Sequence, residues 1–131
     1  MEQSPQSQQT SPFQQPYISP EQTLLEKLDK LITAKLREEK LPNYYAKACG
    51  MRLTVLNKIT LKQKGKTVSE LIDQKLLHEI KHQLWHTSQP AKVISYLYGF
   101  SDPSYFYRYF KRETGISIRQ FRQREVTSTI Y

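Results

Sequence analysis

The chain contains almost no cysteine and no long apolar run, and each absence excludes a class of protein. Cys49 is the only cysteine in 131 residues, so the sequence excludes an internal disulfide framework. No run of about eighteen apolar residues is present, which argues against a membrane span. The first residues also lack the pattern of a signal peptide. Together these absences predict a cytoplasmic protein. Cys49 falls on the apolar face of a predicted helix, so we expect a buried, unreactive thiol.

Acidic side chains are also scarce. The sequence has 12 Asp and Glu against 20 Lys and Arg, a formal net charge of +8. Glu2 is the only charged residue in residues 1–19, so the rest of the chain carries one unit more, +9. A basic domain attracts polyanions, and nucleic acid is the commonest of these. On charge alone, an anionic membrane surface and a generally solubilising charge stay open as alternatives.

No set of residues typical of catalysis appears. The sequence offers no nucleophile–base pair, no glycine-rich phosphate loop and no paired carboxylates placed for a cleft. His78, His82 and His86 recur every four residues, a spacing that can place imidazoles on one metal ion. No cysteine or carboxylate completes that set, and the spacing matches the solvent side of a helix. The sequence therefore predicts no enzyme activity, no metal site and no cofactor.

Residues 1–19 differ in composition from the rest. They are rich in Gln, Ser, Thr and Pro and have no hydrophobic period, as expected for a disordered tail or a linker. Residues 20–131 form the predicted folded domain. Its first element is a helix from Pro20 to Lys40, which Ser19 can cap and in which leucines recur at three- and four-residue spacing.

A pair of helices joined by a glycine-containing turn is predicted at about residues 43–64. Asn43 can cap the first helix, Gly50 gives the turn, and the second helix begins at about Leu53. Two helices joined by such a turn are typical of a helix-turn-helix, whose second helix enters the major groove of DNA.

A second pair of this kind is predicted at about residues 90–114. Ser88 or Thr87 can cap its first helix, and Ser101 can cap its second. Aromatic residues of the second helix allow two interpretations, because they could stack on unpaired bases or form a core. Most fall on the predicted inner face, so we expect the core for Phe106 and Phe110 and the core edge for Tyr109. Tyr105 is the fourth aromatic residue that resembles such a nucleic-acid stacking set.

A long helix at residues 67–86 separates the two pairs. Thr67 and Glu70 have the spacing of a capping box at its start. Apolar residues then recur at every fourth position, typical of a packed stripe: Val68, Ile72, Leu76, Ile80 and Leu84. About 18 helical residues span roughly 27 Å, which approaches the ~34 Å between major-groove segments on one face of a duplex. With a last helix at residues 117–126, capped by Ser117, the chain is predicted to be all-α with about seven helices.

The second pair also carries a specific sequence pattern. Its residues are Gly99-Phe100-Ser101-Asp102, Ser104-Tyr105-Phe106, Arg108-Tyr109-Phe110-Lys111-Arg112 and Gly115-Ile116-Ser117. This pattern resembles the signature of the AraC-type transcription regulators, and the resemblance extends over about Asn43 to Arg122. It implies two homeodomain-like helix-turn-helix subdomains joined by one long helix.

The chain departs from the family pattern at four positions. Ser95 and Ile118 replace a usual alanine and a usual proline in the second half. Arg52 and Thr60 replace a usual capping serine and a usual core phenylalanine in the first half. Arg52 therefore predicts either a poorly capped helix or a contact with a phosphate, and Thr60 predicts a thinner local core.

The resemblance implies a sequence-specific transcription regulator that binds double-stranded DNA. Polar residues on the outer faces of the two second helices would read base edges, and basic residues would contact phosphates. Asn57 could read adenine in a bidentate way, Lys58 could donate to guanine, and the Thr54 methyl could meet thymine. The expected base-reading residues are Thr54, Asn57, Lys58, Pro103, Ser104, Tyr107 and Arg108. The expected phosphate contacts are Arg52, Lys62, Lys111 and Arg112.

The resemblance also implies partners outside this chain. AraC-type proteins often carry an N-terminal ligand-sensing and dimerising domain, so we interpret the chain as an excised DNA-binding part, with a small stand-alone protein as the alternative. RNA polymerase and a dimer partner are expected, with a nucleoid-associated location, and analogy favours activation over repression. The alternative function is a protein-interaction module of AraC-like fold that docks another regulator rather than DNA.

Overall fold

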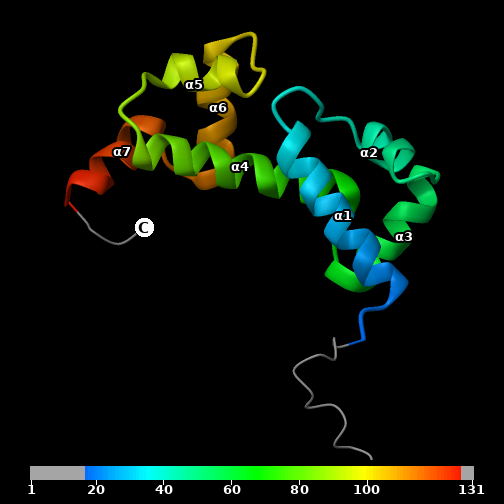
Figure 1. The fold of residues 1–131 in the computed structure, drawn as a ribbon. Helices are drawn as coiled ribbons and strands as arrows, with labels where there is room; N and C mark the ends of the chain where they lie inside the picture. Colours follow the sequence, from blue (N-terminus) through cyan, green and yellow to red (C-terminus); the bar gives the residue numbers. More distant parts are fainter. Residues whose placement is uncertain (1–16, 128–131) are drawn as a thin grey trace, which may run out of the picture.

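The computed structural model describes residues 17–127, with side chains through residue 123, and this part of the chain forms seven α-helices and no strand (Figure 1). The helices are α1 Pro20–Lys35, α2 Pro42–Ala48, α3 Leu53–Lys64, α4 Val68–His86, α5 Ala91–Leu97, α6 Pro103–Thr114 and α7 Ile118–Thr127. The predicted all-α class with about seven helices is confirmed. The prediction of a disordered tail falls, for residues 1–16, outside the described residues.

The helices form two lobes on one central helix (Figure 1). The first lobe is α1–α3 on one half of α4, and the second lobe is α5–α7 on the other half. The apolar stripe of α4 is at most 4% exposed and forms part of the core: Val68, Ile72, Leu76, Ile80 and Leu84. The two helix-turn-helix units, α2–α3 and α5–α6, are therefore joined by one continuous helix, as the sequence predicts.

Local capping sets the start of three helices. The hydroxyl groups of Ser19, Thr67 and Ser117 each accept a hydrogen bond from the backbone N–H three residues further on. The side-chain oxygen of that later residue in turn accepts from the backbone N–H of the capping residue. These three predicted caps are confirmed. Arg52 makes no side-chain hydrogen bond at the start of α3, which is the poorly capped helix start that its substitution predicts.

The first lobe corrects two predicted helix ends. Helix α1 ends at Lys35 rather than Lys40: residues 36–38 form a turn in which the Glu38 and Glu39 N–H groups both donate to the Lys35 carbonyl. Leu36 is still buried, at 1% exposed. Helix α2 begins at Pro42 with Leu41 as the N-cap, rather than after a capping Asn43. Proline suits the first helical position, since its missing N–H would have no partner within the helix.

The second lobe corrects two predicted caps. The Thr87 hydroxyl donates to the Gln83 carbonyl at 2.7 Å and closes the end of α4, so α5 begins without a side-chain cap. Asp102, and not Ser101, caps α6, because Asp102 Oδ1 accepts from the Ser104 N–H at 3.0 Å. A carboxylate is favourable at this position because the helix start carries a partial positive charge.

The aromatic core of the second lobe follows the sequence expectation with one exception. Phe106 and Phe110 are fully buried, and Tyr109 is 7% exposed. Tyr105 is 45% exposed and is the member of the aromatic set that lies outside the inner face. Ser95, which departs from the family pattern, is fully buried, and its hydroxyl donates to the Lys92 carbonyl at 2.6 Å.

Candidate nucleic-acid interface

Helix α3 has one buried apolar face and one exposed face, which carries polar side chains together with Val55 and Leu61. Leu56 is fully buried, whereas Thr54, Lys58 and Lys62 are exposed. Residues four apart lie on the same face of a helix, so these three exposed side chains form a single edge. Two predicted base-reading residues, Thr54 and Lys58, therefore lie together on the surface. Arg52 is exposed at the start of the same helix.

Asn57, a third predicted base-reading residue, is anchored within the first lobe. It is half-buried, and its Oδ1 accepts a hydrogen bond from the Val68 N–H at 2.9 Å. Val68 is the first residue of α4, so the amide satisfies one of the backbone N–H groups that a helix start leaves open. A bidentate contact with adenine needs the same oxygen. An amide oxygen has two lone pairs, so the predicted adenine contact would have to share Oδ1 with the Val68 N–H.

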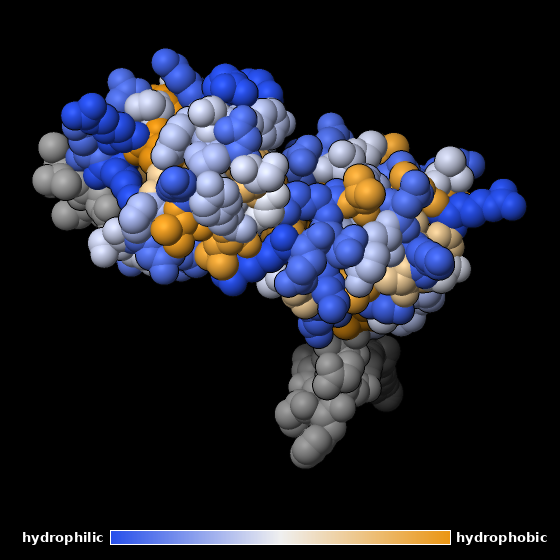
Figure 2. Space-filling model, turned by 90° about the horizontal axis from the view of Figure 1, so that it is seen from above, coloured by the Kyte–Doolittle hydropathy of each residue, from blue (hydrophilic) through white to orange (hydrophobic). Residues whose placement is uncertain are grey.

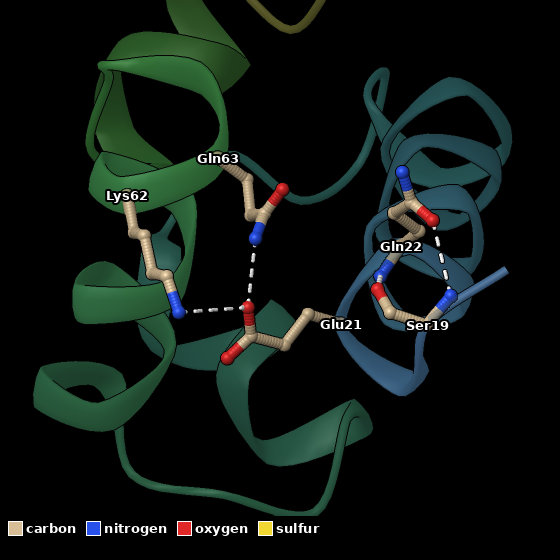
Figure 3. Close-up of polar contacts among 5 residues, drawn as sticks. All are labelled: Ser19, Glu21, Gln22, Lys62 and Gln63. Carbon is tan, nitrogen blue, oxygen red and sulfur yellow. Dashed lines mark hydrogen bonds and ion pairs between the residues drawn. The ribbon is translucent and has the colours of Figure 1, made fainter.

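Lys62, a predicted phosphate contact, has a carboxylate beside it. Its Nζ lies 3.7 Å from Glu21 Oε1, and the Gln63 amide donates to the same oxygen at 2.7 Å (Figure 3). Glu21 lies in the first turn of α1, next to the Ser19 cap, so the contact ties α1 to the end of α3. The Lys62 side chain is 71% exposed, and an exposed pair of this kind is weak and exchangeable. A phosphate that contacts this lysine would compete with the Glu21 carboxylate for it.

Helix α6 repeats the arrangement of α3. Phe106 and Phe110 are fully buried, whereas Ser104, Tyr107 and Arg108 are exposed. Among residues 17–123, Arg108 is in none of the salt bridges. The two other predicted contacts of this helix are half-buried Pro103 and exposed Lys111. Four of the five residues predicted to contact DNA from this helix are therefore exposed, and the fifth, Pro103, is half-buried.

Arg112 is more constrained than its neighbours. Its Nε donates to Glu113 Oε2 at 3.2 Å, and its guanidinium lies 5.6 Å from the centre of the Tyr109 ring. Hydrogen bonds with Glu113 and then Tyr105 raise the pKa of the guanidinium. The Arg112 side chain is still 60% exposed, so a phosphate contact would again mean exchange of one partner for another.

Hydrophilic residues predominate on the face seen in Figure 2, over both lobes, and apolar residues appear there as separate patches. Among residues 17–127, no helix has both the length and the hydropathy needed to cross a bilayer. Two exposed basic and polar helices, each backed by a buried apolar face and joined through α4, are the geometry of a double helix-turn-helix. A family model described as a helix-turn-helix domain matches residues 45–124, from α2 into α7.

The chain belongs to the AraC-type helix-turn-helix family.

Three solved structures share the fold of this AraC-type chain. A transcriptional regulator with an AraC-type DNA-binding domain from Chromobacterium violaceum is 21% identical, with a TM-score of 0.71 over 79% of this chain and 93% of that one. The C-terminal domain of the two-component response regulator yesN from Fusobacterium nucleatum is 20% identical, with a TM-score of 0.68 over 76% and 98%. A DNA-binding transcriptional dual regulator from Escherichia coli K-12 is 16% identical, with a TM-score of 0.69 over 87% and 100%. No curated protein sequence matches the chain.

The family is one of DNA-binding transcription regulator domains. His78, His82 and His86 are exposed, as predicted, and the rings of His82 and His86 lie 4.4 Å apart. In residues 17–123, no group of three or more His, Cys, Asp and Glu side chains is placed to hold a metal ion. Cys49 is half-buried, and burial raises the pKa of its thiol, which makes the thiol less reactive at neutral pH.

One residue of this AraC-type chain has a structural role that the sequence does not reveal. The Arg122 guanidinium donates to the Leu84 carbonyl at 3.0 Å and to the Thr87 carbonyl at 3.3 Å. These carbonyls lie at the C-terminal end of α4, where four backbone acceptors have no partner within the helix. Arg122 therefore fastens α7 to the end of α4. Its partners lie more than thirty residues away along the chain, so no local pattern predicts the contact.

Proposed function

We propose that this chain is a sequence-specific, double-stranded DNA-binding transcription regulator in which α3 and α6 enter two consecutive major-groove segments. Helix α4 has 19 residues, which corresponds to about 28 Å of helix, close to the ~34 Å between such segments. The formal charge of +8 supplies the attraction to phosphates. The two recognition helices differ in sequence, so the proposed site is non-palindromic and one chain binds it.

The matched pair Lys58 and Arg108 carries this proposal. Both side chains are exposed, and each lies two residues after a fully buried residue, Leu56 in α3 and Phe106 in α6. A cation held in this way by a rigid helix can donate to the acceptors of guanine in the major groove. The same type of contact is thus available at two points of one molecule.

Neighbouring residues complete the proposed contacts. In α3, Thr54 contacts a base beside Lys58, and Asn57 offers its amide nitrogen together with an oxygen that already accepts from the Val68 N–H. In α6, Ser104 and Tyr107 flank Arg108. Pro103 adds an apolar contact. The proposed phosphate contacts are Arg52, Lys62, Lys111 and Arg112.

The regulatory part of the proposal rests on the family. Activation through contact with RNA polymerase is the proposed outcome of DNA binding, and an N-terminal ligand-sensing domain is the proposed route to a dimer. These points are fold-level analogy and come from no residue contact in the chain.

Footprinting on the best duplex recovered from a randomised library tests the DNA-binding part. We expect two protected major-groove segments one helical turn apart on the same face of the duplex. Lys58→Ala should relax base preference in one segment and Arg108→Ala in the other. Lys35→Ala, which removes a cation from the exposed last turn of α1, is the matched control and should change neither. Protection of a single segment would refute the proposal that α3 and α6 enter two consecutive major-groove segments.

A binding assay with genomic fragments distinguishes DNA binding from the alternative function, a protein-interaction module. Failure to bind any genomic fragment at physiological salt, by a chain with native helicity, would instead favour a protein-interaction module.

A further inference from the structure

The loop between α1 and α2, residues 36–41, reaches from the first lobe to the second. In Figure 1 it lies near the turn between α5 and α6, and the residue contacts confirm that the two segments touch. The Arg37 guanidinium lies 5.2 Å from the centre of the Tyr98 ring. Tyr98 is the C-cap residue directly after α5 and is 1% exposed, so the ring is packed within the second lobe. A cation at this distance from an aromatic face is attracted to it.

Lys40 makes a second contact between the lobes. A Cβ added at Gly99 would lie 2.7 Å from Lys40 Nζ and 3.2 Å from the Arg37 carbonyl oxygen, so the loop lies directly on the α5–α6 turn. Gly99 also has φ +85°, a backbone conformation that favours glycine. Lys40 Nζ donates to the Arg37 carbonyl at 3.4 Å, and burial lowers the pKa of this ammonium group. The lysine is therefore partly withdrawn from water by the second lobe.

The loop is itself fixed to the first lobe. Leu36 is 1% exposed, and the Tyr45 hydroxyl of α2 donates to the Glu39 carbonyl at 2.5 Å. On the other side, Tyr98 faces Glu79 of α4: burial raises the pKa of the Tyr98 hydroxyl, and the nearby Glu79 carboxylate raises it further. Tyr98 is thus the point at which the α1–α2 loop, the central helix and the second lobe meet.

Two lobes joined only through a helix can rotate and bend relative to each other as that helix twists and curves. A second contact, away from the helix axis, removes this freedom. We propose that loop 36–41 is an interlobe brace in which Arg37 and Lys40 are positioning residues that fix α3 relative to α6, and so restrict binding to one spacing between the two groove segments. The spacing role rests on the proposed DNA-binding function, whereas the brace itself does not.

Distance distributions between spin labels test the brace without DNA. Lys47→Cys and Lys92→Cys, at exposed positions on α2 and α5, place one label on each lobe in a Cys49→Ser background. We expect a narrow distribution that broadens in Arg37→Ala and in Lys40→Ala at unchanged helicity. Arg37→Lys keeps a cation over the ring and should restore most of the narrow distribution, and Lys35→Ala should leave it unchanged. An unchanged width in both alanine variants would overturn the brace.

Affinities for duplexes of altered spacing test the consequence. One or two base pairs are inserted or removed between the two protected segments of the best selected duplex. We expect Arg37→Ala to reduce the discrimination between the best and the altered spacing by about twofold to fivefold, the range of a cation–π contact made by an exposed arginine. A folding defect would instead weaken binding to every duplex by the same factor. An unchanged spacing profile would overturn the spacing role.

The two failures are distinguishable. Absence of duplex binding by the wild-type chain would refute the proposed function and the spacing role with it. The distance measurement would still decide whether the brace exists.

Discussion

Replacement of Asn57 by alanine separates a structural role from a DNA-reading role. Asn57→Ala removes the acceptor of the Val68 N–H, and Val68 is fully buried, so water cannot replace the lost partner. A buried donor left without a partner costs about 1–3 kcal/mol. For a domain of this size, such a loss should lower the melting temperature by about 5–15 °C. We therefore expect a large stability effect from a residue on α3, a proposed recognition helix.

Urea and thermal unfolding followed by circular dichroism provide the measurement. Asn57→Asp keeps an oxygen at the same position and adds a charge that a helix start favours, so it should retain most of the stability. Lys58→Ala, the next residue on the exposed face, should change the free energy of unfolding by less than about 0.5 kcal/mol. If Asn57→Ala melted like the wild type and lost preference at one adenine, the structural role would be refuted and the base-reading role supported.

Three further predictions follow from the contacts described. Arg108→Ala should weaken specific binding by about 1–3 kcal/mol and relax one base position, whereas Lys111→Ala should weaken binding to all sequences alike; equal losses on selected and random duplexes for both variants would contradict these roles. Glu21→Gln releases Lys62 from its carboxylate and should raise affinity for any duplex by about two- to fivefold in low salt, with the gain disappearing in high salt; a gain that is independent of salt would contradict the exchange. Burial raises the pKa of Tyr45 from 10.0 to about 12, so the folded state holds this proton more tightly than the unfolded state. Stability should therefore fall as pH rises from about 10 to about 12, and Tyr45→Phe should remove that part of the decline seen in alkaline titration of unfolding.

Several contacts on the proposed DNA-facing surface are already made within the protein. Lys62 lies beside Glu21, and Arg112 is bonded to Glu113. Both pairs are solvent-exposed, so exchange for a phosphate costs little, and the pairs keep these long side chains near the surface edge in the absence of DNA. These ion pairs should therefore lower the affinity for DNA more than the sequence specificity, because phosphate contacts carry no base information.

The sequence by itself determined the helices and their order. Capping boxes at Ser19, Thr67 and Ser117 and the apolar stripe of α4 depend on residues three or four apart, and such contacts form wherever the helix forms. The motif from Gly99 to Ser117 likewise lies within one short segment, which is why it indicated the family. The misplaced ends of α1, α2 and α6 differ by a few residues, because neighbouring positions such as Ser101 and Asp102 can both cap and only the packed backbone selects one.

The hydrogen-bond partners of several polar side chains depend on the tertiary structure alone. Asn57 bonds to a backbone group eleven residues away, Gln63 to a carboxylate 42 residues away and Arg122 to a carbonyl 38 residues away. The contact between Arg37 and Tyr98 is of the same kind. A helical period indicates which side of a helix is polar, but it does not distinguish a side chain that faces DNA from one that faces another helix. That distinction depends on which elements pack together, and here the packing of both lobes on α4 made it.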